Sequence, residues 1–428
     1  MVFYNFDRQL LAKIETTEGT AISAAASNYI DTLTDISVEF SPVSHARELV
    51  RPGFTTVPDI FASGSIGSGA IVGTGTISFQ VEASMKTETT PVTIAPQWGA
   101  LLQGCGFSLV EDIKRIGAGA ISGGPVLNRE NLLVAASPVG QTVGTTFTGD
   151  SFIYYEDGGG ISASDAVSGA VSSASFAASG SETDVGLAYV LDTAKGTGNG
   201  SSLSLYLYRA GRIWSFKGCR GTVSFQFNST DRVIMSFTME GVAHSIVNGS
   251  KLTNLAFGHS LPSLFNDATM KINEHGAEST AFTGANFESI TLDLGNEIAL
   301  RPNANAAAGY TSAIITGRAP TMSLTADSVV GGTTAAAVFD WAKFRATGAS
   351  IRTEWKCGAG LDAKSLLFRA PAFQVSGQDF DDRDGIEADA VSGNLTGGLY
   401  GDSVVASTGA SRYYDDRGMD NELTIVLF

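Results

Sequence analysis

The strongest constraint on the fold is a repeated order of segments. Two parts of the chain each present a strand, an irregular stretch, a second strand and a short helix. The first part has ISVEF (36–40) and TISFQVEA (76–83), with apolar residues at a period of two. ESITLDL (288–294) and PTMSLTA (320–326) take the same places in the second part. The order predicts two domains of similar plan.

A constant offset of 243 positions supports the repeat, in the pairs Phe79 with Met322, Val81 with Leu324, and Trp98 with Trp341. Both tryptophans fall at helical spacing, in PQWGALLQGCG and FDWAKFRATGA. We expect short helices whose indole rings anchor them to the core, the alternative being sugar-stacking residues. Order, period and offset together predict an internal duplication, against the alternative of two unrelated β-sandwiches.

The predicted organisation is mostly β, with two tandem β-sandwich or barrel domains, each with a short flanking α-helix. We expect an N-terminal arm (1–35), a first β domain (36–242), a linker (243–283) and a second β domain (284–428). A Gly/Ser/Ala-rich loop region, about 111–200, is predicted as an insertion in the first domain.

Smaller segments refine this organisation. Residues 150–242 are predicted to be a meander of short strands, with a hairpin turn at Arg209-Ala210-Gly211. Residues 158–184 are too small and polar to add much core, which predicts an exposed loop. The stretches 41–75 and 296–316 are predicted as long loops, the first because of its prolines and glycines.

The charge balance limits the class of partner. The chain has 27 Lys and Arg against 43 Asp and Glu, a formal net charge of −16. A protein that reads nucleic-acid sequence normally carries a basic face, so this class is disfavoured. Solubility is the simplest interpretation of the acidic surplus.

Cysteines and hydropathy indicate the compartment. Cys105, Cys219 and Cys357 lie far apart and form no CxxC pair, which predicts buried thiols made in a reducing cytosol. Charges interrupt the N-terminal apolar residues, so no signal peptide is expected. No apolar run approaches about 18 residues, so no membrane partner is expected either.

Catalytic and metal motifs are scarce in the sequence. The four histidines are scattered, and no GxSxG elbow or GK[ST] phosphate loop occurs. The carboxylates in GQDFDDRDGI (377–386) do not fit a calcium loop, because Phe380 would have to be a ligand. A tight turn before Ile386 is the better interpretation, with an incidental cation as the alternative. We expect no catalytic residue, cofactor or metal, and hence no enzyme.

Charged residues in the two long stretches suggest an interface. Each stretch contains Arg-Pro, at Arg51 and at Arg301. Solvated charges are the simpler interpretation, but matching placement in both parts favours an interface role. The candidate residues are Arg47, Glu48, Arg51, Phe54 and Ile60 in the first stretch and Glu297 and Arg301 in the second.

Several segments, in order along nearly the whole chain, resemble the tail tube (major tail) proteins of long non-contractile-tailed bacteriophages. They are LLAKIETTEGT, RELVRPGF, GTISFQVEA followed by PQWGALLQGCGF, KGCRGTVSFQF, ESITLDLGN, ITGRAPTMSL, and RDGIEADA with the final NELTIVLF. The low-complexity region and the strands beside it depart from that pattern.

The resemblance implies a structural virion protein whose rings stack into a hollow tube that conducts the genome. A duplicated member would need three chains for a pseudo-hexameric ring, and a hexamer is the alternative. The long stretches become candidate ring-stacking loops. Other partners implied are the tape measure, tail terminator and distal tail proteins, and passing DNA bound without sequence specificity. The resemblance implies assembly in the host cytoplasm and, with the net charge, a negatively charged lumen.

Two other functions remain open from the sequence. A surface-binding, adhesin-like β protein would use the 158–184 insertion and exposed aromatics, for which the candidates are Tyr154, Tyr155, Tyr413 and Tyr414. A β-rich hydrolase is the third possibility, but no catalytic set supports it.

Overall fold

The computed structural model shows a mostly β protein, as predicted, with two short α-helices among the residues it describes. The described residues are 8–33, 36–42, 44–51, 54–62, 73–84, 94–122, 126, 130–143, 152–170, 172, 174–191, 200–255, 262, 264–266, 270–274, 286–306, 308–328, 341–348, 350–357, 365–383, 385–396 and 422–427. Tyr413 and Tyr414 lie outside them.

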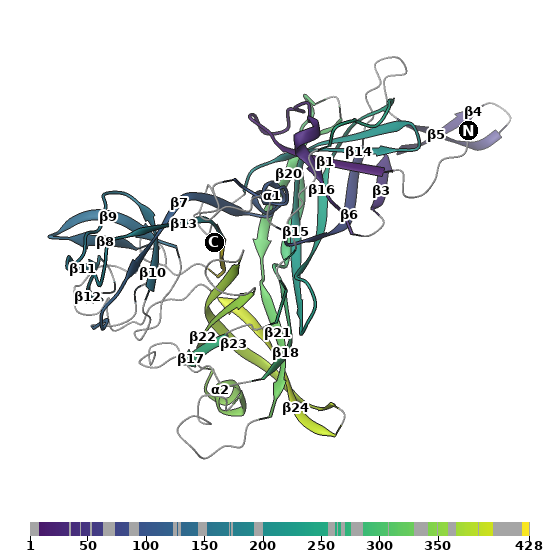
Figure 1. Cartoon of the computed structure of the whole chain (residues 1–428). Coiled ribbons are helices and arrows are strands. Elements are labelled where there is room, and N and C mark those ends of the chain that lie inside the picture. The colour runs from purple at the N-terminus through teal and green to yellow at the C-terminus, as the bar shows by residue number, and fades with distance from the viewer. Residues whose placement is uncertain are drawn as a thin grey trace, which may run out of the picture.

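A continuous antiparallel sheet, here called the central sheet, runs through both halves of the chain (Figure 1). Each half contributes four neighbouring strands. In spatial order they are β3 (Ser37–Pro42), β6 (Gly73–Glu82), β16 (Ile234–Asn248) and β15 (Arg212–Asn228), then β18 (Phe287–Asp293), β21 (Thr321–Asp327), β24 (Ile386–Thr396) and β23 (Leu366–Arg383). The two halves join where β15 pairs with β18.

A β-hairpin interrupts each half at the same connection. Strands β4 (Ser44–Arg51) and β5 (Phe54–Ala62) lie between β3 and β6, and β19 (Asn296–Pro302) and β20 (Tyr310–Arg318) lie between β18 and β21. The predicted loops over 41–75 and 296–316 are therefore wrong. The first hairpin is a separate two-stranded ribbon, in which Pro58 is tolerated because no third strand needs its missing N–H.

A short helix follows β6 in the first half of the chain, and another follows β21 in the second half. The helix α1 (Gly99–Gly104) begins directly after Trp98, and α2 (Trp341–Thr347) begins at Trp341. Both indole side chains lie in the main core at 2% exposure. Trp98 donates a hydrogen bond to the Ser84 carbonyl at 2.6 Å and packs against Tyr189, while Trp341 packs edge-on against Phe344.

Further strands flank the central sheet. They lie in the two regions predicted as an N-terminal arm and a linker. The region predicted as an N-terminal arm contains β1 (Arg8–Ile14), a short 3-10 helix (Ala26–Asn28) and β2 (Tyr29–Ile30). β1 pairs with β14 (Leu203–Arg209), because its apolar residues enter the main core.

The predicted linker also contributes strands. β16 continues to Asn248, and β17 (Met270–Glu274) pairs with β22 (Ser350–Cys357) of the second half. The final strand β25 (Thr424–Leu427) pairs with β23 and with β13 (Thr183–Leu191). The C-terminal strand therefore joins the second half to the region inserted in the first.

The inserted region is a folded β module, which corrects the expected Gly/Ser/Ala-rich loop. Strands β7 (Phe107–Gly117) and β13 lead to it and return from it, and it projects from the body in Figure 1. Its strands are β8 (Asn131–Val134), β9 (Ser137–Thr142), β10 (Phe152–Asp157), β11 (Ala166–Gly169) and β12 (Ser175–Ala177). Apolar residues spaced among the serines, such as Val167 and Phe176, fill a separate hydrophobic core.

All the segments of the predicted meander form strands, but only β14, β15 and β16 pair in consecutive order, whereas β10 pairs with β7 and β9 and β13 pairs with β7 and β25. The turn at Ala210 and Gly211 has positive φ at both residues, as a tight two-residue hairpin requires. The segments RIWSFKG and TVSFQF form one long strand, β15, instead of two. Its register shifts between Lys217 and Arg220, around Gly218 at φ +58°, so that one strand bends between two layers.

Candidate self-assembly surface

The seven predicted interface residues all lie on the two hairpins. Arg47, Glu48 and Arg51 are on β4, and Phe54 and Ile60 are on β5, with Arg47 opposite Asp59 in the register. Glu297 and Arg301 are exposed residues of β19. The structure therefore groups these residues into two ribbons and does not gather them into one pocket.

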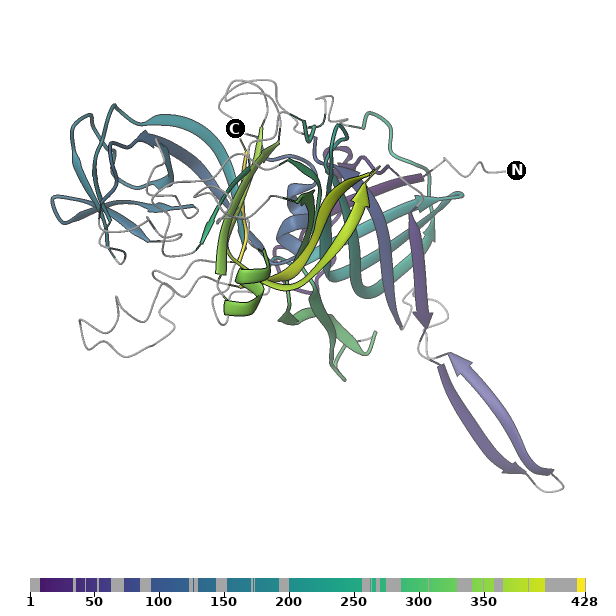
Figure 2. The same cartoon turned by 90° about the horizontal axis from the view of Figure 1, so that it is seen from below.

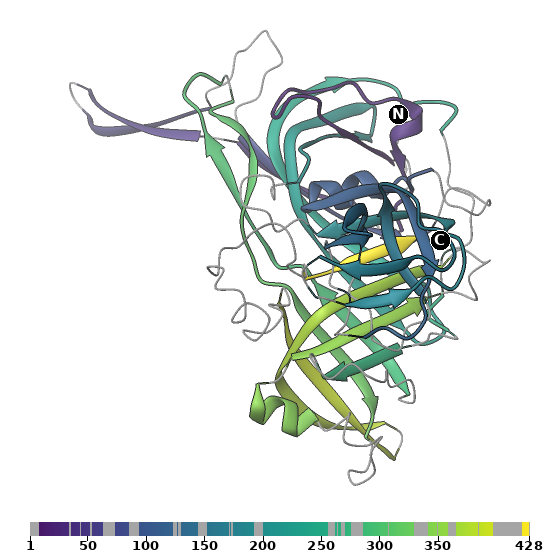
Figure 3. The same ribbon diagram turned by 90° about the vertical axis from the view of Figure 1, so that its left-hand side faces the viewer.

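Both hairpins leave the central sheet on the same side. Figure 2 shows β4–β5 extending away from the body, and Figures 2 and 3 place β19–β20 on the same side of the sheet. A paired ribbon with both edges open presents backbone donors and acceptors on each side. Ribbons of this kind suit contacts with another molecule.

Both strands of the β19–β20 hairpin are held where they join the central sheet. Asn296, at the start of β19, donates to the carbonyls of Cys105 and Gly221, each at 2.8 Å. Arg318, at the end of β20, contacts both carboxylate oxygens of Glu422 at 3.1 Å. Both oxygens contact the same Arg318 nitrogen, Nη2, in a charge-assisted interaction. The ribbon is therefore fixed at its root.

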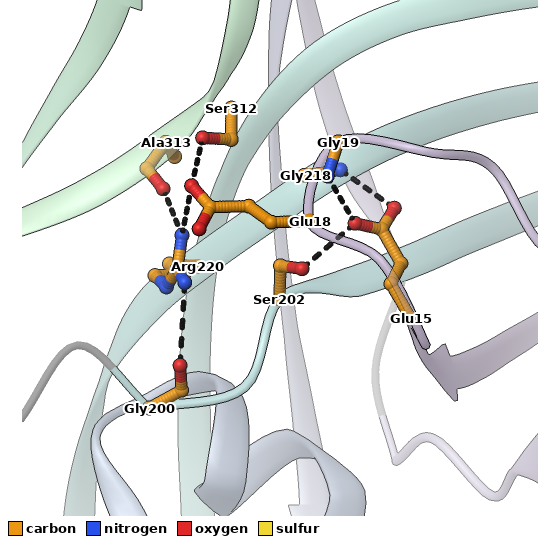
Figure 4. A network of polar contacts seen from close by, with 9 residues as sticks. All are labelled: Glu15, Glu18, Gly19, Gly200, Ser202, Gly218, Arg220, Ser312 and Ala313. Carbon is orange, nitrogen blue, oxygen red and sulfur yellow. Dashed lines mark hydrogen bonds and ion pairs between the residues drawn. The ribbon is translucent and has the colours of Figure 1, made fainter. Parts of the chain in front are cut away.

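A buried carboxylate, Glu15, organises the turn that follows β1 (Figure 4). It accepts hydrogen bonds from the backbone N–H groups of Gly19 and Gly218, each at 2.8 Å. Ser202 and Ser204 donate to it at 2.8 Å and 2.9 Å. Four donors compensate the loss of hydration, which lets a carboxylate lie only 8% exposed.

A second group, Glu18, Arg220 and Ser312, connects this turn to the second hairpin. The Arg220 guanidinium, 4% exposed, lies 3.3 Å from Glu18 and also donates to the carbonyls of Gly200 and Ala313. Ser312 on β20 donates to the same Glu18 carboxylate. We call Glu15, Glu18, Arg220 and Ser312 the polar anchor. It ties the first half of the chain to β20 near the turn of the β19–β20 hairpin.

The surroundings of the polar anchor change the pKa of one of its residues, Glu18. Partial burial alone would raise the pKa of Glu18, but hydrogen bonds from Ser312 and Arg220 and the positive charges of Arg220 and Arg301 outweigh it. The pKa of Glu18 is therefore lowered on balance. The ionised form is the one that the fold favours.

The chemistry of the anchor is structural. The hydroxyl of Ser312 donates to Glu18, and that of the neighbouring Ser202 donates to Glu15. Among the described residues no group of three His, Cys, Asp or Glu is placed to hold a metal. The carboxylates at 379–382 all lie on β23, and in the turn to β24 the Gly385 N–H donates to Asp382 at 2.8 Å.

One face of the central sheet carries hydroxyl, amide and carboxylate groups. The residues facing away from the core in segments 74–82, 222–228, 234–240, 289–293 and 321–327 are mostly Ser, Thr, Asn and Gln. Neighbouring strands link them, as in Gln80 with Ser236 at 3.1 Å. In these segments the face has no Lys or Arg. Its carboxylates are Glu82, Glu240, Asp293 and Asp327.

The aromatic residues proposed for surface binding are buried where the structure describes them. Tyr154 is 6% exposed and Tyr155 is 0% exposed. Tyr155 donates to Glu182, and Arg369 lies over the Tyr154 ring at 4.9 Å. Their alternation in β10 serves packing on both faces of the strand, so neither ring is a glycan platform.

Sequence reasoning missed the polar anchor entirely. Glu15 and Glu18 stand in ETTEG, an ordinary polar stretch, and their partners lie about 200 and 300 residues away in the chain. One feature of the sequence could have indicated the polar anchor: the charged residue Arg220 stands between small residues and apolar strand segments. Only the bend of β15 brings these parts together.

No protein-family model matches the chain, and no curated protein matches it in sequence. No helix in the described residues has the length and hydropathy needed to cross a membrane.

Proposed function

We propose that the chain is a structural virion protein, a ring-forming subunit of the tail tube of a long-tailed bacteriophage. The observation that carries the proposal is the junction between the halves. There β15 of one four-strand unit pairs edge to edge with β18 of the next, so the same unit is already joined side by side within one chain. Repeating that joint between chains closes a barrel without free edges.

The hydroxyl- and carboxylate-bearing face of the central sheet supports a conduit. A duplex passing a basic wall would be held by phosphate contacts, whereas carboxylates repel the backbone and hydroxyls offer no net charge. Glu240, Asp293 and Asp327 supply negative charge to this face, whereas Glu82 pairs with Arg232 at 2.6 Å. Oriented inward in a ring, the face would form a lumen that lets DNA slide.

The hairpins support stacking of rings. β4–β5 and β19–β20 leave the sheet on the same side, so in a closed ring they would all point along one axial direction (Figures 2 and 3). The polar anchor and the Arg318–Glu422 pair would then transmit axial force from the second hairpin into the sheet. The inserted module, remote from the hairpins, would decorate the outside.

Electron microscopy of the purified full chain in negative stain tests the proposal. Hollow rings or stacked tubes are expected, with ring masses near three times the 44.4 kDa of one chain by light scattering. Discrete monomers over the whole concentration range that bind bacterial cells would instead support the adhesin alternative. Particles that neither assemble nor bind cells would contradict both.

A further inference from the structure

Strands β24 and β25 lie in one line along the same edge of β23, because β22 occupies the opposite edge beside both. β24 ends with Thr396 opposite Ala372, and β25 begins with Thr424 opposite Arg369. The break between them is about three residue positions, or roughly 10 Å, along β23. The chain uses residues 397–423 to cross it.

The internal repeat shows which strand of the first half corresponds to this interrupted row. Phe79 pairs with Phe237 on β16, and its repeat partner Met322 pairs with Gly393 on β24. β16 therefore takes the place of β24, and β15, which pairs with β16, takes the place of β23.

The first half crosses the same place with a single residue. Glu240 and Val242 of β16 hold the places of the two strand ends, and only Gly241 stands between them. Residues 397–423 are therefore far more chain than the break needs. Fully extended, a chain of that length spans about 85 Å. It is long enough to carry β25 to another molecule.

β25 fills a slot between two strands that, in the described residues, meet only through it. It pairs with four residues of β13 and four of β23. Its side chains are 0–1% exposed, with Ile425 and Leu427 in the main core and Val426 in a core shared with β7, β10 and β13. The slot therefore requires an extended apolar strand.

We propose that β25 of one copy fills the slot between β13 and β23 of a neighbouring copy. This inference rests on the proposed ring, which holds neighbouring copies close together. The slot makes the same contacts with either strand, so exchange sacrifices no contact, and the long connection permits it. The contact of Glu422 with Arg318, at the start of β25, then also joins two copies.

Exchange of β25 interlocks the copies. Each copy completes the cores of its neighbour, so two copies separate only when a buried strand is withdrawn from its slot. The exchanged strand also holds the inserted module of the neighbour, because Val426 packs in the same core as Tyr154 and Val185.

A disulfide can show which copy supplies the strand. Ala188 lies opposite Val426, and both are 0% exposed. Because Leu191 donates its N–H to the Leu423 carbonyl at 3.0 Å, the 188–426 pair, three positions along, is a non-hydrogen-bonded pair, whose side chains lie close. The full chain carrying both Ala188→Cys and Val426→Cys is assembled, oxidised and run on a non-reducing denaturing gel. Covalently linked trimers are expected.

Controls establish that the cysteine pair reports on exchange. Oxidised below the concentration needed for assembly, the double variant should form its disulfide within one chain, because a lone copy fills its own slot. Each single variant should form none, since the three native cysteines are buried at 0–1% exposure. Assembled double variant with disulfides only within single chains would overturn the exchange.

Shortening the connection tests exchange without new cysteines. Gly-Ser in place of residues 399–420 still crosses the break within one chain but leaves little chain to reach another copy. The monomer should keep its melting temperature, whereas the concentration needed for assembly should rise about tenfold or more. A Gly-Ser-rich segment of the original length is the matched control and should assemble as the wild type does. Normal assembly of the shortened chain would overturn the exchange.

The outcomes separate this inference from the proposed function. Wild-type rings together with normal assembly of the shortened chain, or with disulfides only within single chains, would leave the ring proposal standing without exchange. A wild-type chain that never forms oligomers would overturn the proposed function and this inference with it.

Discussion

At the scale of single residues, Glu15 shows how a carboxylate can stabilise a fold from inside it. It receives two backbone N–H groups and two hydroxyls drawn from three separate parts of the chain. The turn after β1, the bend of β15 and the start of β14 therefore depend on one side chain. Loss of that side chain leaves several donors without an acceptor at once.

Glu15→Ala is expected to lower the free energy of unfolding by roughly 2–4 kcal/mol, because buried donors lose their charged acceptor. Urea denaturation of the purified chain measures the change. Glu39→Ala, at an exposed position of β3, is the control and should stay within about 0.5 kcal/mol of wild type. Equal stability of the two variants would refute an organising role for Glu15.

Glu18 makes stability depend on pH in the acid range. Its folded pKa is lowered below the usual 4.5, so its contribution is complete above that value and disappears as pH falls through the folded pKa. Glu18→Gln is expected to lose less stability than wild type between about pH 5 and pH 3, measured by urea denaturation at each pH. Parallel pH profiles for the two proteins would contradict the assignment.

At the scale of elements, alternation of apolar residues predicted the strands of the central sheet well. Ile77, Phe79 and Val81 face the core as expected, since a period of two has one structural solution in a half-buried strand. The hairpins were predicted as loops because ribbons with two open sides do not need a hydrophobic face. The inserted module was missed because its core residues, such as Ile161, Val167 and Phe176, stand singly among glycines, serines and alanines instead of in clear alternating runs.

Removal of the first hairpin is expected to separate stacking from folding. Pro42 lies opposite Gly73, so a short Gly-Ser link can join β3 to β6 in place of residues 43–72. The shortened chain should keep its circular dichroism spectrum and form single rings that no longer stack, seen by electron microscopy. Tubes of normal length from this variant would show that the hairpin has no part in stacking.

At the scale of the whole molecule, the repeated strand order was within reach of the sequence and the connections between layers were not. The offset of 243 positions relates strands that occupy equivalent places in the central sheet. No local sequence pattern predicts that β25 pairs with both β13 and β23, or that Ser312 donates a hydrogen bond to Glu18. Such contacts depend on how the sheet curves, which only the assembled core determines.

In the part of the chain that the structure describes, the inserted module occurs in one half only, between β7 and β13. In a ring of three chains, the inner wall would therefore repeat six times while the outer decoration would repeat three times. A tube built from such rings would carry a sparse array of inserted modules on a nearly uniform wall. In the proposed tube, duplication of the unit would free every second position on the exterior to diverge without disturbing the bore.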